Sequence, residues 1–432
     1  MIDIKKIRLL YPMVSYGLIV VLNAAAIKWV VLSLGIEGSA DFALLLAIAT
    51  FTHIVLIQPL TYWILRDLQG ALEDQKLSEL VSVAATRLAP LALLTIVCCI
   101  LLMLVDRSGI LHFQLGFELI LLATLYGFVT AMQQIAIGIL NISKLEPKAF
   151  VVILVAFILQ ISWMVGLYHF GCRSLVILFM GMICIRTATV FVGIYMGPLA
   201  KKALVQSGNQ TVKKKFWKEM NRYTGAFCIW GLFSYLGMLG DRWIAAYELT
   251  KIDLGLYSVM YMTSYSLVSA ISIGIRQAVT PIIFRRVGYG SDTARKNSAS
   301  TVINIALVIL FSIHLVMIIF SYLFADFIIT FFASESFTIY ADSLYLLFLG
   351  ASFLNIAQFL TNHGIVERTI WPYIPVKIVY SVSLIGVLLL LPFALNIPTL
   401  IHVGLVLNFF YMVGIILINK LRFNRTLISD TK

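Results

Sequence analysis

Long apolar runs alternate with short polar segments along almost the whole chain. Each run has about 20 residues, the length at which an α-helix crosses the hydrocarbon core of a bilayer. The pattern predicts an all-α polytopic membrane protein with about twelve transmembrane helices, over Tyr11–Leu34, Asp41–Leu65, Leu88–Val105, Gly116–Leu140, Ala149–Phe170, Ser174–Met196, Tyr223–Tyr247, Leu254–Phe284, Ser300–Phe324, Ala341–Thr361, Trp371–Leu391 and Pro398–Ile418.

Positively charged residues gather in the segments on one side of these predicted spans. Of the 32 Lys and Arg residues, 24 lie on the side that carries both termini, 4 lie in the opposite loops or at the adjoining end of a span, and 4 lie deeper within spans. Because cytoplasmic loops are enriched in Lys and Arg, this distribution predicts a multi-pass protein with both termini in the cytoplasm. The net charge of +12 then reflects loops that contact anionic membrane lipids, and it does not indicate a nucleic-acid partner.

The composition excludes a large soluble domain. Hydrophobic residues make up 61% of the chain and charged residues 12%, about half the usual share of a soluble protein. The first apolar run is long enough to span the membrane and lacks a small-residue cleavage site, so we expect it to be retained. No motif for nucleotide hydrolysis, metal binding or a catalytic nucleophile is present. We therefore expect neither an enzyme nor a cofactor, and uphill transport would draw on a gradient of H⁺ or Na⁺, on a partner or on a sink for the product.

A basic segment falls after the sixth predicted span and divides the chain near its middle. Lys28-Trp29 in the first span resembles Arg242-Trp243 in the seventh, and each pair precedes a short acidic connection and a helix that ends in Pro. This similarity predicts two six-helix lobes related as a parallel repeat around a central cavity. The predicted division is a lobe over 1–200, a cytoplasmic linker over 201–222 and a lobe over 223–432.

Four basic residues lie inside the predicted spans, where ionised side chains are rare. An ionised side chain at the centre of a bilayer costs roughly 2.5–3.5 kcal/mol on insertion scales, so such residues face protein or water. Only one carboxylate, that of Asp241, lies clearly within a span, so ion pairing inside the protein does not neutralise all four. The surplus positive charge predicts a negatively charged ligand. The four residues are Lys28, Arg186, Arg276 and Lys377.

The surroundings of these cations leave alternatives open. Arg276 belongs to a polar stripe with helical spacing, which indicates either a watery cavity or interhelical hydrogen bonds. Lys28 and Lys377 either line a cavity or extend toward the membrane interface. The other members of the stripe are Tyr265, Ser269, Ser272 and Thr280.

Other polar residues within the spans are also candidates. Asp241 either forms an ion pair with Lys28 or Arg242 or acts as a protonatable coupling group. The amides of Gln133, Gln134 and Gln358 bind either sugar hydroxyls or neighbouring helices. The histidines at positions 53, 314 and 402 do not have the spacing of metal ligands.

Two segments of the second half resemble a known family of transporters. Asp241-Arg242, the segment Asp253-Leu254-Gly255-Leu256-Tyr257 and Pro281 are similar to the connection between the seventh and eighth helices of bacterial polysaccharide flippases. The segment from Phe331 to Phe337 is similar to their outer loop before the tenth helix. The chain thus resembles Wzx-like lipid-linked oligosaccharide flippases of the multidrug/oligosaccharidyl-lipid/polysaccharide exporter superfamily.

This resemblance implies a function and a location. The family flips undecaprenyl-pyrophosphate-linked oligosaccharide units across the bacterial inner membrane through a cationic cavity, for O-antigen, lipopolysaccharide, capsule or exopolysaccharide assembly, and works beside polysaccharide polymerases. We expect the head group to be captured by Arg276 and Lys377, to pass Arg186 and to leave near Lys28 and Arg242. The predicted substrate-binding residues are Lys28, Arg186, Arg242, Tyr265, Ser272, Arg276 and Lys377.

Three other functions fit the pattern less well. A cation-coupled multidrug antiporter of the same superfamily would need carboxylates in its cavity, where this chain has basic residues. A lipid II flippase typically has fourteen spans. A membrane polymerase or glycosyltransferase usually has a large external loop or a catalytic domain.

Overall fold

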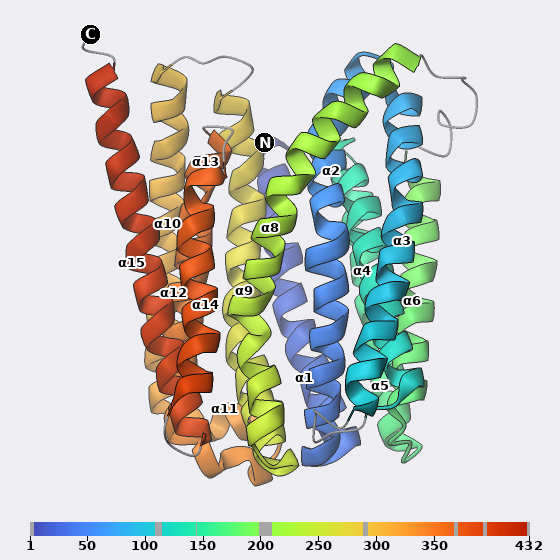
Figure 1. Cartoon of the computed structure of the whole chain (residues 1–432), viewed down its shortest axis with the longest axis vertical. Helices are drawn as coiled ribbons and strands as arrows, with labels where there is room; N and C mark the ends of the chain where they lie inside the picture. Colours follow the sequence, from blue (N-terminus) through green and yellow to red (C-terminus); the bar gives the residue numbers. More distant parts are fainter. Residues whose placement is uncertain are drawn as a thin grey trace. The chain divides into compact units, whose positions relative to one another are not determined.

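The computed structural model describes residues 4–108, 115–143, 145–197, 210–287, 293–366, 370–391 and 395–429, and these residues are helical apart from short turns. Figure 1 shows the long helices side by side within each part of the chain. Their bounds are α1 Ile4–Phe51, the π-helix η1 Thr52–Ile57, α2 Gln58–Glu73, α3 Leu77–Arg107, α4 Phe117–Ile142, α5 Glu146–His169, α6 Leu175–Met196, α8 Gln210–Glu248, α9 Lys251–Val287, α10 Thr293–Leu323, α11 Ala325–Phe332, the 3-10 helix η2 Glu335–Ser343, α12 Leu344–Leu360, α13 Asn362–Val366, the 3-10 helix η3 Trp371–Tyr373, α14 Ile374–Leu390 and α15 Ile397–Ser429.

The helices confirm the prediction of an all-α polytopic membrane protein. Ten helical segments of the described chain are long and apolar enough to cross a bilayer, and the first of them, Ala25–Leu68, has 44 residues. That segment changes direction at Gly35, whose φ of 70° and ψ of −171° are not helical. The first two predicted spans lie on either side of this kink, and the predicted span Tyr223–Tyr247 lies within α8.

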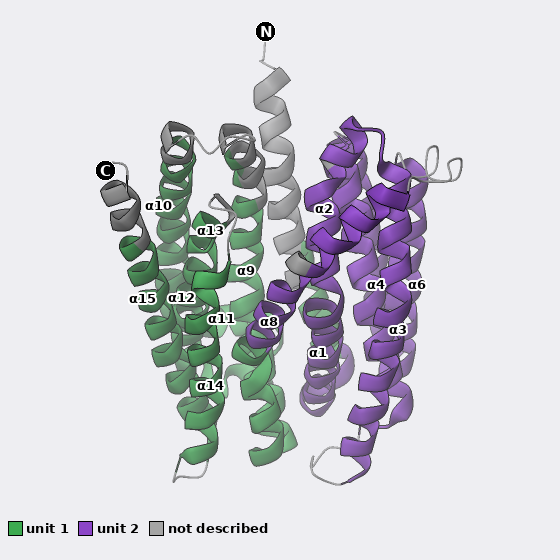
Figure 2. Cartoon of the chain, turned by 45° about the horizontal axis from the view of Figure 1, so that its top comes forward, with its two compact units in different colours: residues 1–32, 236–432 green, residues 33–235 purple. Residues whose placement is uncertain are grey.

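The contacts divide the chain into two compact units. Unit 1 comprises residues 1–32 and 236–432, and unit 2 comprises residues 33–235 (Figure 2). Residues 25–32 of α1 therefore group with the C-terminal helices, while α8 up to Tyr235 groups with the helices of the N-terminal half. The predicted lobes over 1–200 and 223–432, and the repeat that relates them, stay predictions.

Unit 2 contains close helix contacts and a π-helical turn. A Cβ atom on Gly127 of α4 would lie 2.2 Å from the carbonyl oxygen of Ala49, so only Gly allows this approach of α4 to α1. Pro59 lacks the N–H that would bond the carbonyl of Val55 in a regular helix. Instead the N–H of Gln58 bonds the carbonyl of His53, five residues back, and η1 results. This turn sets the position of His53.

In unit 1 a bundle of α9, α10, α12, α14 and α15 surrounds buried polar side chains. Within this bundle α9 packs against α10 and α12, and α15 packs against α12 and α14. Small residues allow close contact: a Cβ atom on Gly237 of α8 would lie 2.3 Å from the Tyr380 ring of α14. These packed helices enclose most of the predicted site residues of the second half.

Candidate functional site

In unit 2 the guanidinium of Arg186 lies among neutral partners. Arg186 is on α6 and is partly buried. Its Nη1 donates to Oε1 of Gln133 on α4 at 2.5 Å, and its guanidinium carbon lies 4.8 Å from the centre of the Tyr126 ring. Its Nε is buried without a hydrogen-bond partner. Arginine stays protonated in proteins, so this site retains a full positive charge.

A second polar pair of unit 2 involves the neighbouring amide. Nε2 of His53 lies 3.0 Å from Oε1 of Gln134, so a hydrogen bond joins η1 to α4. Gln133 is buried against Arg186, whereas Gln134 is exposed. The two consecutive amides of α4 thus contact different partners, as expected for side chains about 100° apart around a helix.

In unit 1 Asp241 and Arg242 interact mainly with tyrosines. The hydroxyl of Tyr257 and the backbone N–H of Arg242 both donate to the Asp241 carboxylate. The Arg242 guanidinium, in a side chain only 5% exposed, lies 4.2 Å from the centre of the Tyr261 ring. Among the described residues, the ion pairs within 4 Å that the structure contains are Arg66–Asp67 and Lys76–Asp74. The expected ion pair of Asp241 with Lys28 or Arg242 is not among them.

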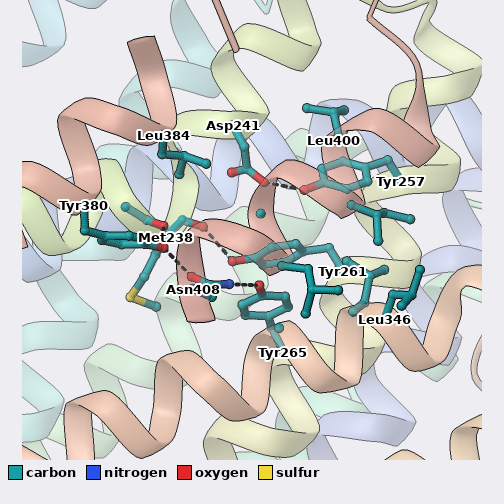
Figure 3. A pocket seen from close by; sticks show the side chains of 16 residues that line it. Met238, Asp241, Tyr257, Tyr261, Tyr265, Leu346, Tyr380, Leu384, Leu400 and Asn408 are labelled. Atoms are coloured by element: carbon teal, nitrogen blue, oxygen red, sulfur yellow. Dashed lines mark hydrogen bonds between the residues drawn. The ribbon is translucent and has the colours of Figure 1, made fainter. Parts of the chain in front are cut away.

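A chain of hydrogen bonds continues from these tyrosines through Asn408 (Figure 3). The rings of Tyr261 and Tyr265 stack with centres 3.8 Å apart, and Nδ2 of Asn408 donates to the Tyr265 hydroxyl at 2.8 Å. The Tyr380 hydroxyl lies 2.6 Å from Oδ1 of Asn408 and 2.7 Å from the carbonyl oxygen of Gly237. A hydroxyl carries one proton and cannot fully donate to both. The opposite amide orientation of Asn408 gives every group a partner, with Tyr265 donating to Asn408 and Asn408 to Tyr380.

These groups line a small cavity in unit 1. Its volume is about 20 Å³, which is enough for about one water molecule. Polar groups of Asp241, Tyr257, Tyr265, Tyr380 and Asn408 converge on it. In this conformation the cavity can hold a water molecule or a small ion, and it has no room for a sugar.

Lys377 lies inside the same bundle. Its side chain is 0% exposed, and its Nζ lies 4.5 Å from the centre of the Tyr411 ring and 5.3 Å from that of the Tyr380 ring. Such positions over aromatic faces stabilise a cation by about 0.5–2 kcal/mol. Lys377 does not extend to the membrane interface here, and a ligand cannot reach it without a change of conformation.

The polar stripe of α9 makes interhelical hydrogen bonds. Ser269 accepts from Nδ2 of Asn355 on α12 at 3.2 Å, and the Ser272 hydroxyl lies 3.2 Å from Nε2 of His314 on α10. With Tyr265 bonded to α15, three members of the stripe join α9 to three other helices. Thr280 lies outside the residues whose side chains are described.

Two predicted cations remain outside this enclosed cluster. Nζ of Lys28 lies 5.2 Å from the centre of the Phe331 ring of α11, and the Lys28 side chain is partly buried. Arg276 is also partly buried, one turn of α9 beyond Ser272. The described residues contain no cluster of three or more His, Cys, Asp or Glu that could hold a metal ion.

Three residues of these clusters, Tyr126, Tyr261 and Asn408, were missed by the sequence analysis. Tyr257, Tyr261 and Tyr265 recur every four residues, a spacing that places them on one face of α9 and that could have identified the cluster. Asn408 and Tyr126 had no comparable signal, because their partners lie far away in the sequence.

Comparisons with known proteins show what the arrangement of helices is similar to. No sequence-family model matches the chain, and no curated protein sequence does. A multidrug resistance MATE family transporter of the MOP superfamily, in an inward-facing conformation, has a TM-score of 0.67 at 14% identity, with 97% of this chain and 96% of that chain covered.

Two further solved structures are similar over nearly the whole chain. The lipid II flippase MurJ, in an inward closed conformation, has a TM-score of 0.66 at 14% identity, with 95% of this chain and 87% of that chain covered. A MOP superfamily transporter from Pyrococcus furiosus, described as having a binding pocket of reverse polarity, has a TM-score of 0.62 at 16% identity, with 95% and 94% covered. The chain is therefore a multi-pass membrane protein with the fold of MOP superfamily transporters.

Proposed function

We propose that this chain is a flippase that moves undecaprenyl-pyrophosphate-linked oligosaccharide units from the cytoplasmic to the outer leaflet of a bacterial inner membrane. The units serve O-antigen, lipopolysaccharide or exopolysaccharide assembly, and the polyprenyl tail stays in lipid while the head group passes through a watery path. Both termini lie in the cytoplasm, and anionic lipids and polysaccharide polymerases are partners. Alternating access of the transporter fold supplies the movement.

The observation that carries this proposal is the neutral environment of Arg186. Its described contacts are an amide oxygen and an aromatic ring, and its Nε has no hydrogen-bond partner. A guanidinium cannot lose its proton at physiological pH, so an anion or water must balance it within the membrane. A pyrophosphate offers several oxygens to a guanidinium, which binds phosphate through two parallel hydrogen bonds.

The other cations have unequal roles in the proposal. Arg276 and Lys28 are partly buried, and we assign Arg276 to capture and Lys28 to release of the head group. Arg242 and Lys377 are enclosed by tyrosines, so they approach the head group only in another conformation. Tyr265 and Ser272 join helices in this conformation and contact substrate only after a rearrangement.

Two of the similar structures support this choice of substrate. One is a lipid II flippase, so the fold is used for a lipid-linked substrate. The other is described by a pocket of reverse polarity and a different function, so the polarity of a pocket varies within the fold. An excess of cations in this chain fits an anionic substrate.

The test is glycan export by cells that depend on this chain. Arg186→Ala and Arg276→Ala should each lower export about 10-fold or more, because each removes charge-assisted hydrogen bonds worth about 1.5–3 kcal/mol. Arg173→Ala is the matched control, since Arg173 is exposed in a loop between predicted spans and should leave export unchanged. Normal export by both variants at native expression would refute the proposal.

A cation-coupled multidrug antiporter is the second candidate function. Asp241 favours it, because a buried carboxylate beside a cavity large enough for a small ion is what H⁺ or Na⁺ coupling requires. Several similar structures are MATE transporters. Efflux of ethidium that depends on a H⁺ or Na⁺ gradient, and is lost in Asp241→Asn, would favour the antiporter. Such efflux should be absent if the chain is a flippase.

A further inference from the structure

The proposed phosphate site does not use the contact between His53 and Gln134. Both side chains are neutral hydrogen-bonding groups, and they lie 3.0 Å apart. Gln134 directly follows Gln133, which contacts Arg186, on α4. Arg186 also acts electrostatically on His53, so the two pairs lie in one region of unit 2. This region combines one permanent cation with two groups suited to hydroxyls.

The exposure of Gln134 indicates a water-facing surface. Gln134 lies eight residues before the end of α4 at Ile142, which is ~12 Å at 1.5 Å per residue, so it lies inside the hydrocarbon layer. An exposed amide at that depth is costly against lipid, and polar groups there face protein or a wet cavity. His53, which is partly buried, reaches the same surface from η1. The pair is therefore accessible to a polar ligand.

The chemistry of the two groups matches a sugar hydroxyl. A neutral imidazole and a carboxamide each supply both a donor and an acceptor, and a hydroxyl needs both. In a lipid pyrophosphate glycan the first sugar is bonded directly to the phosphate that would bind Arg186. Gln133 and Gln134 are consecutive on α4 and point about 100° apart, so the phosphate partner and the hydroxyl partners lie at one level of the helix on neighbouring faces.

We propose that His53 and Gln134 bind a hydroxyl of the sugar attached to the pyrophosphate, while Gln133 positions Arg186 for the phosphate. This inference rests on the proposed function and adds the part of the site that distinguishes a glycan-bearing lipid from the bare lipid pyrophosphate. In the absence of substrate the two side chains bond to each other, and the sugar hydroxyl replaces that contact on binding. A site that hydrogen-bonds a hydroxyl discriminates against a ligand that lacks it.

The experiment measures the affinities of the purified protein for two probes, farnesyl pyrophosphate and the same lipid with N-acetylglucosamine on its terminal phosphate. The unaltered protein should prefer the sugar-bearing probe by about 5-fold or more, the value of one net hydrogen bond. His53→Ala and Gln134→Ala should abolish this preference and leave the affinity for farnesyl pyrophosphate unchanged. Gln160→Ala is the matched control, because Gln160 is an amide of α5 whose Nε2 contacts the sulfur of Met182.

The outcomes separate this inference from the proposed function. Equal affinities of the unaltered protein for both probes, or equal losses for both in the two variants, would overturn the sugar-binding role. A change in melting temperature alone would assign the pair to helix packing and overturn it as well. Unchanged binding of farnesyl pyrophosphate by Arg186→Ala would instead refute the phosphate site. Because Gln134 is exposed, Gln134→Ala should fold even if His53→Ala does not.

Discussion

The two units hold their intramembrane cations in opposite ways. In unit 1 the Arg242 and Lys377 side chains are enclosed and lie over tyrosine rings, with the carboxylate of Asp241 beside Arg242. In unit 2 Arg186 is partly buried, also lies over a tyrosine ring, that of Tyr126, and bonds to one neutral amide, and its Nε is buried without a hydrogen-bond partner. Nε of Arg242 is also buried without a hydrogen-bond partner, so the difference lies in burial and in the neighbouring charge. Unit 1 encloses its cations with a carboxylate nearby, whereas unit 2 leaves a partly buried cation among neutral groups.

This difference shows that the depth of a charge in the membrane does not decide its role. A buried cation with aromatic and carboxylate neighbours stabilises the packing of helices, and its removal leaves a buried charge behind. A cation with only neutral neighbours attracts an anion. Four predictions test this distinction, from the largest expected effect to the smallest.

Arg242→Ala should destabilise the protein by about 3 kcal/mol, because it leaves the Asp241 carboxylate buried without its neighbouring positive charge. The free energy of unfolding in detergent measures this loss. Arg107→Ala, at an exposed position, should change it little. If Arg242→Ala is fully stable and loses only transport, Arg242 is a substrate ligand and the contrast between the units is wrong.

Gln133→Glu should place a carboxylate beside Arg186, as Asp241 lies beside Arg242 in unit 1. The new carboxylate would pair with Arg186 and compete with an anionic ligand, so the affinity for a lipid pyrophosphate should fall roughly 10-fold or more. Stability should be kept or increased. Gln160→Glu is the control for adding a carboxylate to a neighbouring helix. Unchanged affinity in a stable Gln133→Glu variant would contradict the anion site.

Tyr380→Phe should destabilise unit 1 by about 1 kcal/mol, because it removes the hydroxyl that contacts Gly237 and Asn408. The melting temperature measures the change. Tyr322→Phe removes a hydroxyl from a side chain that is 66% exposed and should leave the melting temperature unaltered. An equal effect of both substitutions would show that the hydrogen-bond chain does not support the bundle.

Lys76→Ala should have the smallest effect. The hydrogen bond from Lys76 lowers the pKa of the Asp74 carboxyl, so this ion pair adds stability near neutral pH, and the contribution is lost as the pH falls through that lowered pKa. Both groups are exposed, where ion pairs contribute little. If Lys76→Ala measurably lowers stability at neutral pH, then exposed charged residues contribute as much as buried ones, and the surroundings of a charge do not set its contribution.

The fold could be predicted from the sequence, but the environment of each cation could not. Apolar runs of spanning length depend on local composition, and all twelve predicted spans fall within helices to within one residue. The partners of a cation come from other helices: Gln133 is 53 residues from Arg186. Arg242 and Arg186 look alike in sequence, and only tertiary packing buries Arg242 and leaves Arg186 partly buried among neutral groups. The exception is α9, where the spacing of residues in the sequence identifies both the polar stripe and the face that carries Tyr257, Tyr261 and Tyr265.

The most direct test is the affinity of the purified protein for farnesyl pyrophosphate and for farnesol, with and without Arg186→Gln. If Arg186 binds the phosphate, the unaltered protein prefers the pyrophosphate, and Arg186→Gln lowers that preference about 10-fold or more while farnesol binding stays the same. Arg186→Lys should retain part of it, because a lysine keeps the charge and loses the paired hydrogen bonds. Equal preference for the pyrophosphate in the unaltered protein and in Arg186→Gln would contradict the role of Arg186 as the anion-binding residue.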